Sequence, residues 1–210
     1  MMQDQLRRRI REYYDDTLRL HGRTAAGVDW NSQESQELRF RQFERLWEND
    51  TNATIVDYGC GYGGLASYLR ARGHHGAYAG FDLSEAMIDA AREHTASLPV
   101  CRFTSHRAEL VAADYAVASG ILNVKQDASE HAWQAFAEET IADLASVGLR
   151  GFAFNALTTY SDPEKRRAHL YYADPLRWFD DCKRNYSRFV ALVHDYPLWE
   201  FTILVRRNNV

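Results

Sequence analysis

Hydrophobic positions along the chain switch repeatedly between strand-type and helix-type spacing from residue 54 onwards. Short runs rich in β-branched and aromatic residues predict strands, and a 3.6-residue spacing in most of the intervals between them predicts helices. The first five predicted strands cover residues 54–58, 77–81, 100–104, 114–119 and 150–156. Strands that alternate with helices favour a parallel sheet covered by helices on both faces.

The pattern changes near the C-terminus. Asp174 and Pro175 are typical of a helix N-cap and a first helical residue, and they begin a helix that we predict to reach about residue 184. Two strand patterns follow, at residues 189–194 and 199–205, and only four residues separate them. Because so short a link cannot hold a parallel crossover, we predict an antiparallel hairpin.

Before the first strand, the chain shows helical patterns only. The spacing of apolar residues predicts one helix over residues 3–20 and a second that begins after Ser32, a residue type favoured at N-caps. We therefore predict a single domain over residues 1–210. Its expected fold class is α/β, with a helical lid at residues 1–50 and a Rossmann-like, mainly parallel seven-stranded sheet at residues 51–210.

Composition sets limits on partners and location. The chain has 210 residues, 46% of them hydrophobic and 26% charged, which is ordinary for a globular domain. A net charge of −4 gives no basic surface, so we expect no nucleic-acid partner. No apolar run reaches membrane-spanning length and no secretory signal is visible, so we expect a cytoplasmic protein without membrane contact. Cys60, Cys101 and Cys182 match neither a disulfide framework nor a zinc spacing, and we predict no metal site.

A glycine-rich segment follows the first strand directly. It reads Asp57-Tyr58-Gly59-Cys60-Gly61-Tyr62-Gly63-Gly64 and leads into a helical pattern. Glycines let a ligand lie on the backbone, and a helix N-terminus offers unpaired N–H groups. The spacing of Gly59, Gly61 and Gly64 satisfies G-x-G-x-x-G, a dinucleotide fingerprint. Asp82 ends the second strand about 20 positions later, where an acid can bind both ribose hydroxyls.

The order of elements and three motifs resemble the class I S-adenosylmethionine-dependent methyltransferases of small-molecule type. The motifs are the segment 57–64, the segment Gly80-Phe81-Asp82-Leu83-Ser84-Glu85-Ala86-Met87-Ile88 and the segment Asp114-Tyr115-Ala116-Val117-Ala118-Ser119-Gly120. The resemblance runs from about residue 54 to the C-terminus. It implies S-adenosyl-L-methionine as the cofactor and a small molecule as the methyl acceptor.

The resemblance also implies roles for the residues around the glycine loop. Asp57 would bind the ammonium group and lie favourably near the cationic sulfur, whereas it would repel the pyrophosphate of a dinucleotide. Gly59 and Gly61 match the closest approach of backbone to cofactor. Asp82 would accept hydrogen bonds from the ribose.

Further cofactor contacts are expected on other elements. Leu83 would pack on the adenine, and Ser119 matches the floor of the methyl-transfer site. Arg39 on the second predicted helix could hold the cofactor carboxylate as a bidentate fork, with Arg41 and Arg45 as competing candidates. After the third strand, the acid that the family commonly places near the adenine amino group is displaced or absent.

No motif identifies the acceptor. Aromatic and polar residues of the lid and loops are our candidates for acceptor binding, namely Tyr13, Trp30, Asn123 and Tyr172. A general base is needed only if the acceptor must lose a proton as it attacks. His194 and Asp195, at the end of the predicted sixth strand, are the first candidates for that base, and His169 and Glu200 are alternatives.

Our leading hypothesis is methyl transfer to an oxygen, and less favourably to a nitrogen, of a small molecule. A nicotinamide-dependent oxidoreductase would use the same glycines, but Asp57 and the closing hairpin disfavour it. A non-catalytic cofactor-binding module that regulates a partner is the third alternative. Neither the acceptor nor the oligomeric state follows from the sequence.

Overall fold

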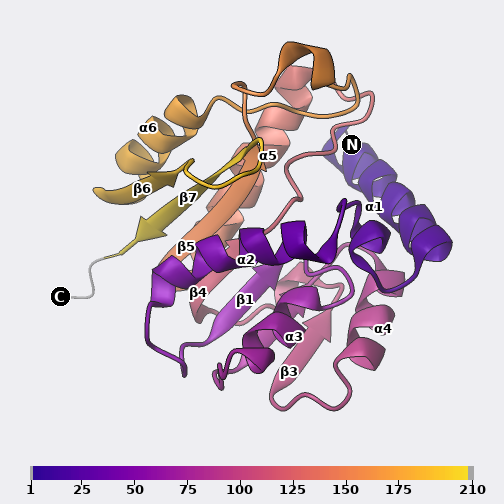
Figure 1. The fold of residues 1–210 in the computed structure, drawn as a ribbon, viewed down its shortest axis with the longest axis vertical. Coiled ribbons are helices and arrows are strands. Elements are labelled where there is room, and N and C mark those ends of the chain that lie inside the picture. The colour runs from indigo at the N-terminus through magenta and orange to yellow at the C-terminus, as the bar shows by residue number, and fades with distance from the viewer. Residues whose placement is uncertain (1, 208–210) are drawn as a thin grey trace.

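The computed structural model describes residues 2–207, and they form one seven-stranded sheet flanked by helices (Figure 1). The strand order is β3-β2-β1-β4-β5-β7-β6. In chain order the strands are β1 Ile55–Tyr58, β2 Tyr78–Phe81, β3 Cys101–Thr104, β4 Ala113–Ala118, β5 Gly148–Leu157, β6 Phe189–Val193 and β7 Glu200–Arg206. Neighbouring strands pair in parallel from β3 to β5, whereas β7 is antiparallel to both β5 and β6. The predicted fold class is confirmed, including the C-terminal hairpin.

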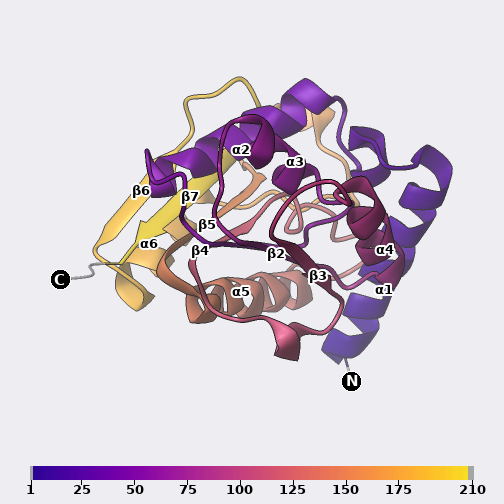
Figure 2. The same cartoon turned by 90° about the horizontal axis from the view of Figure 1, so that it is seen from below.

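The sheet is covered on both faces, as Figure 2 shows along its edge. The longer helices are α1 Met2–His21, α2 Gln33–Trp47, α3 Gly64–Ala71, α4 Glu85–His94, α5 Glu130–Val147 and α6 Pro175–Asn185. Short 3-10 turns lie at η1 Ala25–Val28, η2 Arg107–Glu109 and η3 Pro163–Lys165. Helices α2 and α3 pack on one face, and α5 and α6 pack on the other.

Successive residues of a strand point to opposite faces of the sheet, and this alternation produces two separate core layers. In β1, Ile55 belongs to the core under α2 and α3, and Val56 belongs to the core under α5. In β5, Ala153 faces the first core, whereas Phe152 and Phe154 face the second. Both faces of each central strand are therefore buried, which is typical of parallel sheets.

Side-chain caps fix the helix starts where the sequence placed them. The Ser32 hydroxyl accepts a hydrogen bond from the Ser35 N–H, and Ser84 accepts one from the Met87 N–H. Asp174 accepts bonds from two N–H groups of the first turn of α6. These caps stabilise each first turn by satisfying N–H groups that have no partner within the helix.

The expected lid of residues 1–50 divides into two parts. Helix α2 packs on the sheet through Phe40, Phe43 and Trp47, so most of it is a core layer rather than a lid. Helix α1 and the turn η1 instead lie near α4, at the carboxyl edge of the sheet (Figure 1). Within residues 2–207 no helix combines the length and the apolar character needed to cross a membrane.

Candidate active site

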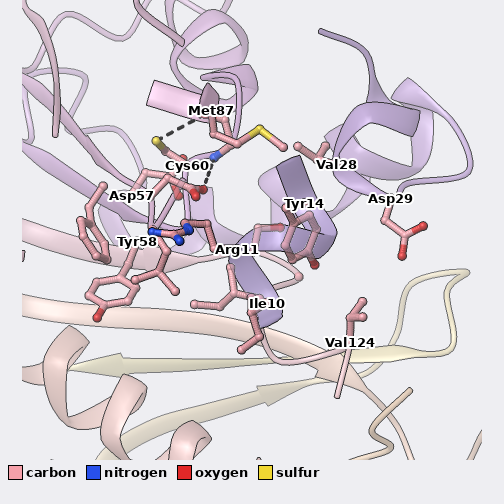
Figure 3. Close-up of a pocket in the computed structure, with 18 of the residues that line it drawn as sticks. Ile10, Arg11, Tyr14, Val28, Asp29, Asp57, Tyr58, Cys60, Met87 and Val124 are labelled. Atoms are coloured by element: carbon pink, nitrogen blue, oxygen red, sulfur yellow. Dashed lines mark hydrogen bonds between the residues drawn. The ribbon is translucent and has the colours of Figure 1, made fainter. Parts of the chain in front are cut away.

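A cavity opens at the carboxyl ends of β1, β2 and β4 (Figure 3). Its floor comes from residues 57–61, 81–83 and 119–121, which follow those three strands. Helix α1 and residues 28–30 form much of its wall, and α2, α4 and α5 contribute further side chains. The chain runs outward from β1 to β2 in one direction and from β4 to β5 in the other, so this is the switch point where ligands bind in open α/β sheets.

The glycine loop leaves the backbone bare on this floor. Gly59 has a φ of +84° and Gly61 a φ of +52°, a region that other residues rarely adopt. A Cβ atom on Gly59 would lie 2.2 Å from Cγ2 of Ile121, and one on Gly61 would lie 2.7 Å from Cγ1 of Val28. Glycine is therefore required both by the turn and by the close approach of the residues that cover it.

Asp57 is a buried acid in the cavity wall, only 3% exposed. The Tyr78 hydroxyl donates a hydrogen bond of 2.5 Å to its Oδ2 atom. Burial raises the pKa of Asp57 to about 7, while this hydrogen bond acts in the opposite direction and nearby Asp82 adds to the rise. A cation in the cavity would stabilise the ionised form of Asp57, because an opposite charge nearby favours ionisation.

Asp82 is held in a fixed orientation by the backbone. Its Oδ2 atom accepts the Gly61 N–H at 2.9 Å, and its Oδ1 atom accepts the Ser84 N–H at 3.0 Å. Burial raises the pKa of Asp82 to about 6, although these backbone bonds lower it. Each carboxylate oxygen can accept a further hydrogen bond. The side chain can therefore bind two neighbouring hydroxyls while it ties the glycine loop to β2.

Trp30 covers the loop after β4. A Cβ atom on Gly120 would lie 2.2 Å from Cζ2 of the Trp30 ring. The guanidinium of Arg39 lies 3.8 Å from the centroid of the same ring, where a cation–π contact is favourable. Arg39 also makes a bidentate pair with Glu200, with bonds of 2.7 Å and 2.6 Å.

This pairing changes the role expected for Arg39. Both of its paired nitrogens bind Glu200, its Nη1 atom donates to the Ser35 carbonyl, and its side chain is only 7% exposed. The residue therefore lies behind Trp30 rather than in the cavity wall. The expected grip on a cofactor carboxylate would require the buried pair to open, and Glu200, an alternative base, is occupied as well.

The other cofactor candidates gather in one place. Asp57, Gly59, Gly61, Asp82, Leu83 and Ser119 all line the cavity, and so does Trp30 among the acceptor candidates.

Three acceptor candidates lie outside the cavity wall. Tyr13 donates a hydrogen bond of 3.0 Å to Asp29, which is itself a cavity residue. Asn123 fastens its loop to β5, since its Oδ1 atom accepts the Leu157 N–H at 3.0 Å. The Tyr172 hydroxyl accepts the Arg167 N–H at 3.0 Å in the loop after β5.

His194 and Asp195 do not reach the cavity. Both are exposed, and they follow β6, the outermost strand. Three strand spacings separate β6 from β4, which corresponds to about 14 Å. The side chain of Asp195 lies 3.9 Å from Arg45, and the His194 ring packs near Tyr160. The sequence placed these residues at the correct edge of the sheet but could not show how far along it they stand.

Helix α1 supplies cavity residues that the sequence analysis missed. These residues are Arg7 and Arg11, which line the cavity beside Ile10 and Tyr14. Figure 3 shows Arg11 projecting toward the side of the cavity that holds Asp57 and Tyr58. The spacing i, i+4, i+7 of Arg7, Arg11 and Tyr14 places them on one helical face. This spacing is the sequence feature that could have indicated a shared cavity-facing side of the helix.

Asn155 on β5 is another functional residue that no sequence motif indicated. Its Oδ1 atom accepts the Gly120 N–H at 2.8 Å, and its Nδ2 atom donates to the Ser119 hydroxyl at 3.2 Å. It is fully buried and positions the loop after β4. Among residues 2–207, no group of acidic, histidine or cysteine side chains could hold a metal ion.

The strand order, the glycine loop and the two acids Asp57 and Asp82 define a Rossmann-like fold with a ligand site at its switch point. Residues 55–147 match the family model of a methyltransferase domain. A putative methyltransferase of Mycobacterium tuberculosis (strain ATCC 25618 / H37Rv) is 49% identical over 156 residues, which make up 74% of this chain and 94% of that protein.

Solved structures share the fold. Magnesium protoporphyrin IX methyltransferase from Synechocystis PCC 6803, with bound S-adenosylmethionine, has a TM-score of 0.66 and 16% identity over 96% of this chain and 97% of that chain. The N-methyltransferase NodS from Bradyrhizobium japonicum WM9 has a TM-score of 0.64 and 13% identity over 94% of this chain and 97% of that chain.

The chain therefore belongs to the methyltransferase-domain family, as a class I enzyme whose cofactor is S-adenosyl-L-methionine. This assignment sets aside the nicotinamide-dependent oxidoreductase. The cavity fits the cofactor, because the buried carboxylate of Asp57 suits a cation, Asp82 can accept further hydrogen bonds, and the bare glycines leave room on the backbone.

Proposed function

We propose that this enzyme transfers the methyl group of S-adenosylmethionine to a hydroxyl oxygen of a small-molecule acceptor. The observation that carries this proposal is Asp29, an exposed cavity residue whose carboxylate accepts a hydrogen bond of 3.0 Å from Tyr13. In Figure 3 Asp29 lies at the end of the cavity away from Asp57, with Tyr14 between them. A carboxylate at that end can take the proton that a hydroxyl must lose as it attacks.

The cofactor end is formed by the residues of the three loops. When bound, S-adenosylmethionine supplies an activated methyl group on a cationic sulfur. Asp57 attracts the positive charge, and Asp82 accepts hydrogen bonds from the ribose hydroxyls. Leu83 packs on the adenine. Ser119, oriented by Asn155, forms the floor beside the reacting atoms.

The walls of the cavity favour a small acceptor. Helix α1 and Trp30 contribute side chains to the same cavity as the glycine loop, so a ligand there is held between the lid and the sheet. Most of the acceleration in such a reaction comes from alignment in a dry site. The net charge of −4 offers no broad basic surface for nucleic acid.

The test is methyl transfer by the wild type and by Asp29→Asn. Asparagine suits this position because Asp29 has a φ of +62°, which asparagine tolerates. Release of S-adenosylhomocysteine is measured with a panel of alcohols and of primary amines. We expect turnover of alcohols and a loss of about 10²- to 10⁴-fold in kcat for Asp29→Asn, with unchanged cofactor affinity.

A matched control is Asp16→Asn. Asp16 is an exposed acid on α1 that pairs with Arg19, outside the cavity wall. This variant should keep full activity. Turnover of amines alone would contradict the oxygen acceptor, and an unchanged kcat in Asp29→Asn with an alcohol would exclude Asp29 as the proton acceptor.

A further inference from the structure

A second hollow adjoins the cavity on the outer side of the Tyr13–Asp29 hydrogen bond. Its walls are formed by Tyr13, Gln126, Asp127, Ala168 and His169. We call it the Tyr13–His169 hollow. It is more open to solvent than the cofactor cavity and lies between α1 and the loops after β4 and β5.

The hollow and the cavity share their boundary. The Tyr13 ring packs edge-on against Tyr14, with centroids 5.2 Å apart, and Tyr14 lines the cavity. Val124 lines the cavity, and Gln126 follows two residues later in the hollow. Together with the hydrogen bond from Tyr13 to Asp29, these contacts place the hollow next to the end of the cavity where Asp29 lies.

Two loops from distant parts of the chain form one wall as a paired ribbon. The Gln126 N–H donates to the His169 carbonyl at 2.8 Å, and the Tyr171 N–H donates to the Asn123 carbonyl at 2.8 Å. Asn123 is in turn bound to the end of β5. The side chains of Gln126 and His169 are therefore held beside each other by backbone pairing.

Backbone strain marks the same place. Gln126 has a φ of +51°, and it is one of only four non-glycine residues with positive φ in the described part of the chain. Such a conformation is unfavourable and persists where the surroundings impose it, often at ligand sites. The strained backbone at Gln126 accompanies the pairing with His169 that builds the wall.

The lining chemistry indicates the class of ligand. The hollow offers a phenol, an amide and an imidazole, all of which exchange hydrogen bonds with hydroxyl groups. The one acid, Asp127, is paired with Arg9 at 2.5 Å, so its charge is balanced. An exposed polar hollow with no unbalanced charge suits a neutral molecule that carries several hydroxyls.

We infer that the Tyr13–His169 hollow is the acceptor subsite and that it binds a polyhydroxylated acceptor, a sugar, with one hydroxyl directed at Asp29. This inference rests on the proposed transfer to a hydroxyl oxygen. The carbon–sulfur bond breaks and sulfur keeps its electron pair. A new carbon–oxygen bond forms, and Asp29 takes the hydroxyl proton. Gln126 and His169 bind the remaining hydroxyls.

The test measures acceptor KM and kcat with methyl α-D-glucopyranoside, methyl α-D-mannopyranoside and UDP-glucose. The glycosides and the nucleotide-linked sugar separate a free sugar from a carrier-bound one. Gln126→Gly removes the amide and relieves the positive φ, so this variant should fold. We expect KM to rise about tenfold in Gln126→Gly and in His169→Ala, with kcat and cofactor affinity nearly unchanged.

The matched control is Val100→Gly. Val100 has a φ of +54°, is exposed and lies before β3, so this change relieves the same strain away from the site. It should leave KM unchanged. Gln126→Asn, which keeps a shorter amide and tolerates the backbone, should recover part of the affinity.

Three different results would each contradict a different part of the proposal. If alcohols are methylated but the KM for the sugars is unchanged in Gln126→Gly and His169→Ala, the hollow is not the acceptor subsite. Transfer to oxygen would still stand. Turnover of simple alcohols, without turnover or saturation-transfer NMR signals from any of the three sugars, would overturn the sugar class. Turnover of amines alone would contradict the proposed function itself.

Discussion

Affinity for S-adenosylmethionine should rise with pH between about 6 and 8, because Asp57 must be ionised to attract the cationic cofactor. Burial raises the pKa of Asp57 from 3.8 to about 7, and Asp82, whose own pKa is raised to about 6, contributes to the rise. The ionised form binds a cation more tightly than the protonated form, so apparent affinity rises with the ionised fraction. It should fall by up to about tenfold from pH 8 to pH 6.

Isothermal titration with S-adenosylmethionine at several pH values measures this dependence. The α-amino group of the ligand itself titrates near 8. The ratio of affinities between the wild type and Asp57→Asn therefore isolates the contribution of the protein. Asparagine keeps the shape and can still accept the bond from Tyr78. A ratio that stays flat between pH 6 and pH 8 would refute the reasoning.

Tyr78→Phe tests whether the ionisation of Asp57 causes the pH dependence. The Tyr78 hydroxyl stabilises the ionised form of Asp57, so its removal should raise the pKa of Asp57 further. The midpoint of the affinity profile should then move to higher pH, and binding near pH 7 should weaken. A midpoint that moves to lower pH would contradict this account.

The same buried acid should reduce the stability of the ligand-free protein at neutral pH. Between pH 3.8 and about 7 the folded state binds more protons at Asp57 than the unfolded state, so this contribution to stability falls as pH rises through that window. The full difference corresponds to at most about 4 kcal/mol. Asp57→Asn should therefore be more stable than the wild type at pH 8 and should lose that advantage at pH 4, as measured by urea unfolding.

Three further predictions test the geometry around the cavity. Asp82→Ala should weaken cofactor binding by about 10- to 100-fold without unfolding the chain, since hydrogen bonds to a charged acceptor are lost; unchanged affinity in titrations would remove Asp82 from the ribose role. Gly59→Ala should lower both thermal stability and cofactor affinity more than Gly73→Ala, because both positions have positive φ but only Gly59 lacks space for a Cβ atom; equal effects would contradict this. Glu200→Gln should lower the free energy of unfolding in urea by about 3–5 kcal/mol, because the Arg39 charge is left buried without its partner. The double variant Arg39→Met, Glu200→Met should lose much less.

The fold could be predicted because its signals are local. Ser32, Ser84 and Asp174 each cap the helix that follows within three residues, and alternation along β1 separates Ile55 from Val56. The mainly parallel sheet and its antiparallel hairpin followed from the alternation of elements and from the short link between the last two strands. The ion pair of Arg39 and Glu200 joins residues 161 positions apart, and no spacing along the chain indicates it.

The cofactor end and the acceptor end of the site also differ in how far the sequence indicates them. The cofactor end is built from short segments that directly follow β1, β2 and β4, so each residue type and its place in the motif point to its role. The acceptor end that we propose brings together Tyr13 of α1, Asp29 after η1, Gln126 after β4 and His169 after β5, and its walls depend on loop pairing that has no motif. A chain can therefore keep a recognisable donor site while its acceptor site changes through loops alone. For this reason the assays with variants at Gln126 and His169, rather than those at the glycine loop, test the proposed acceptor class.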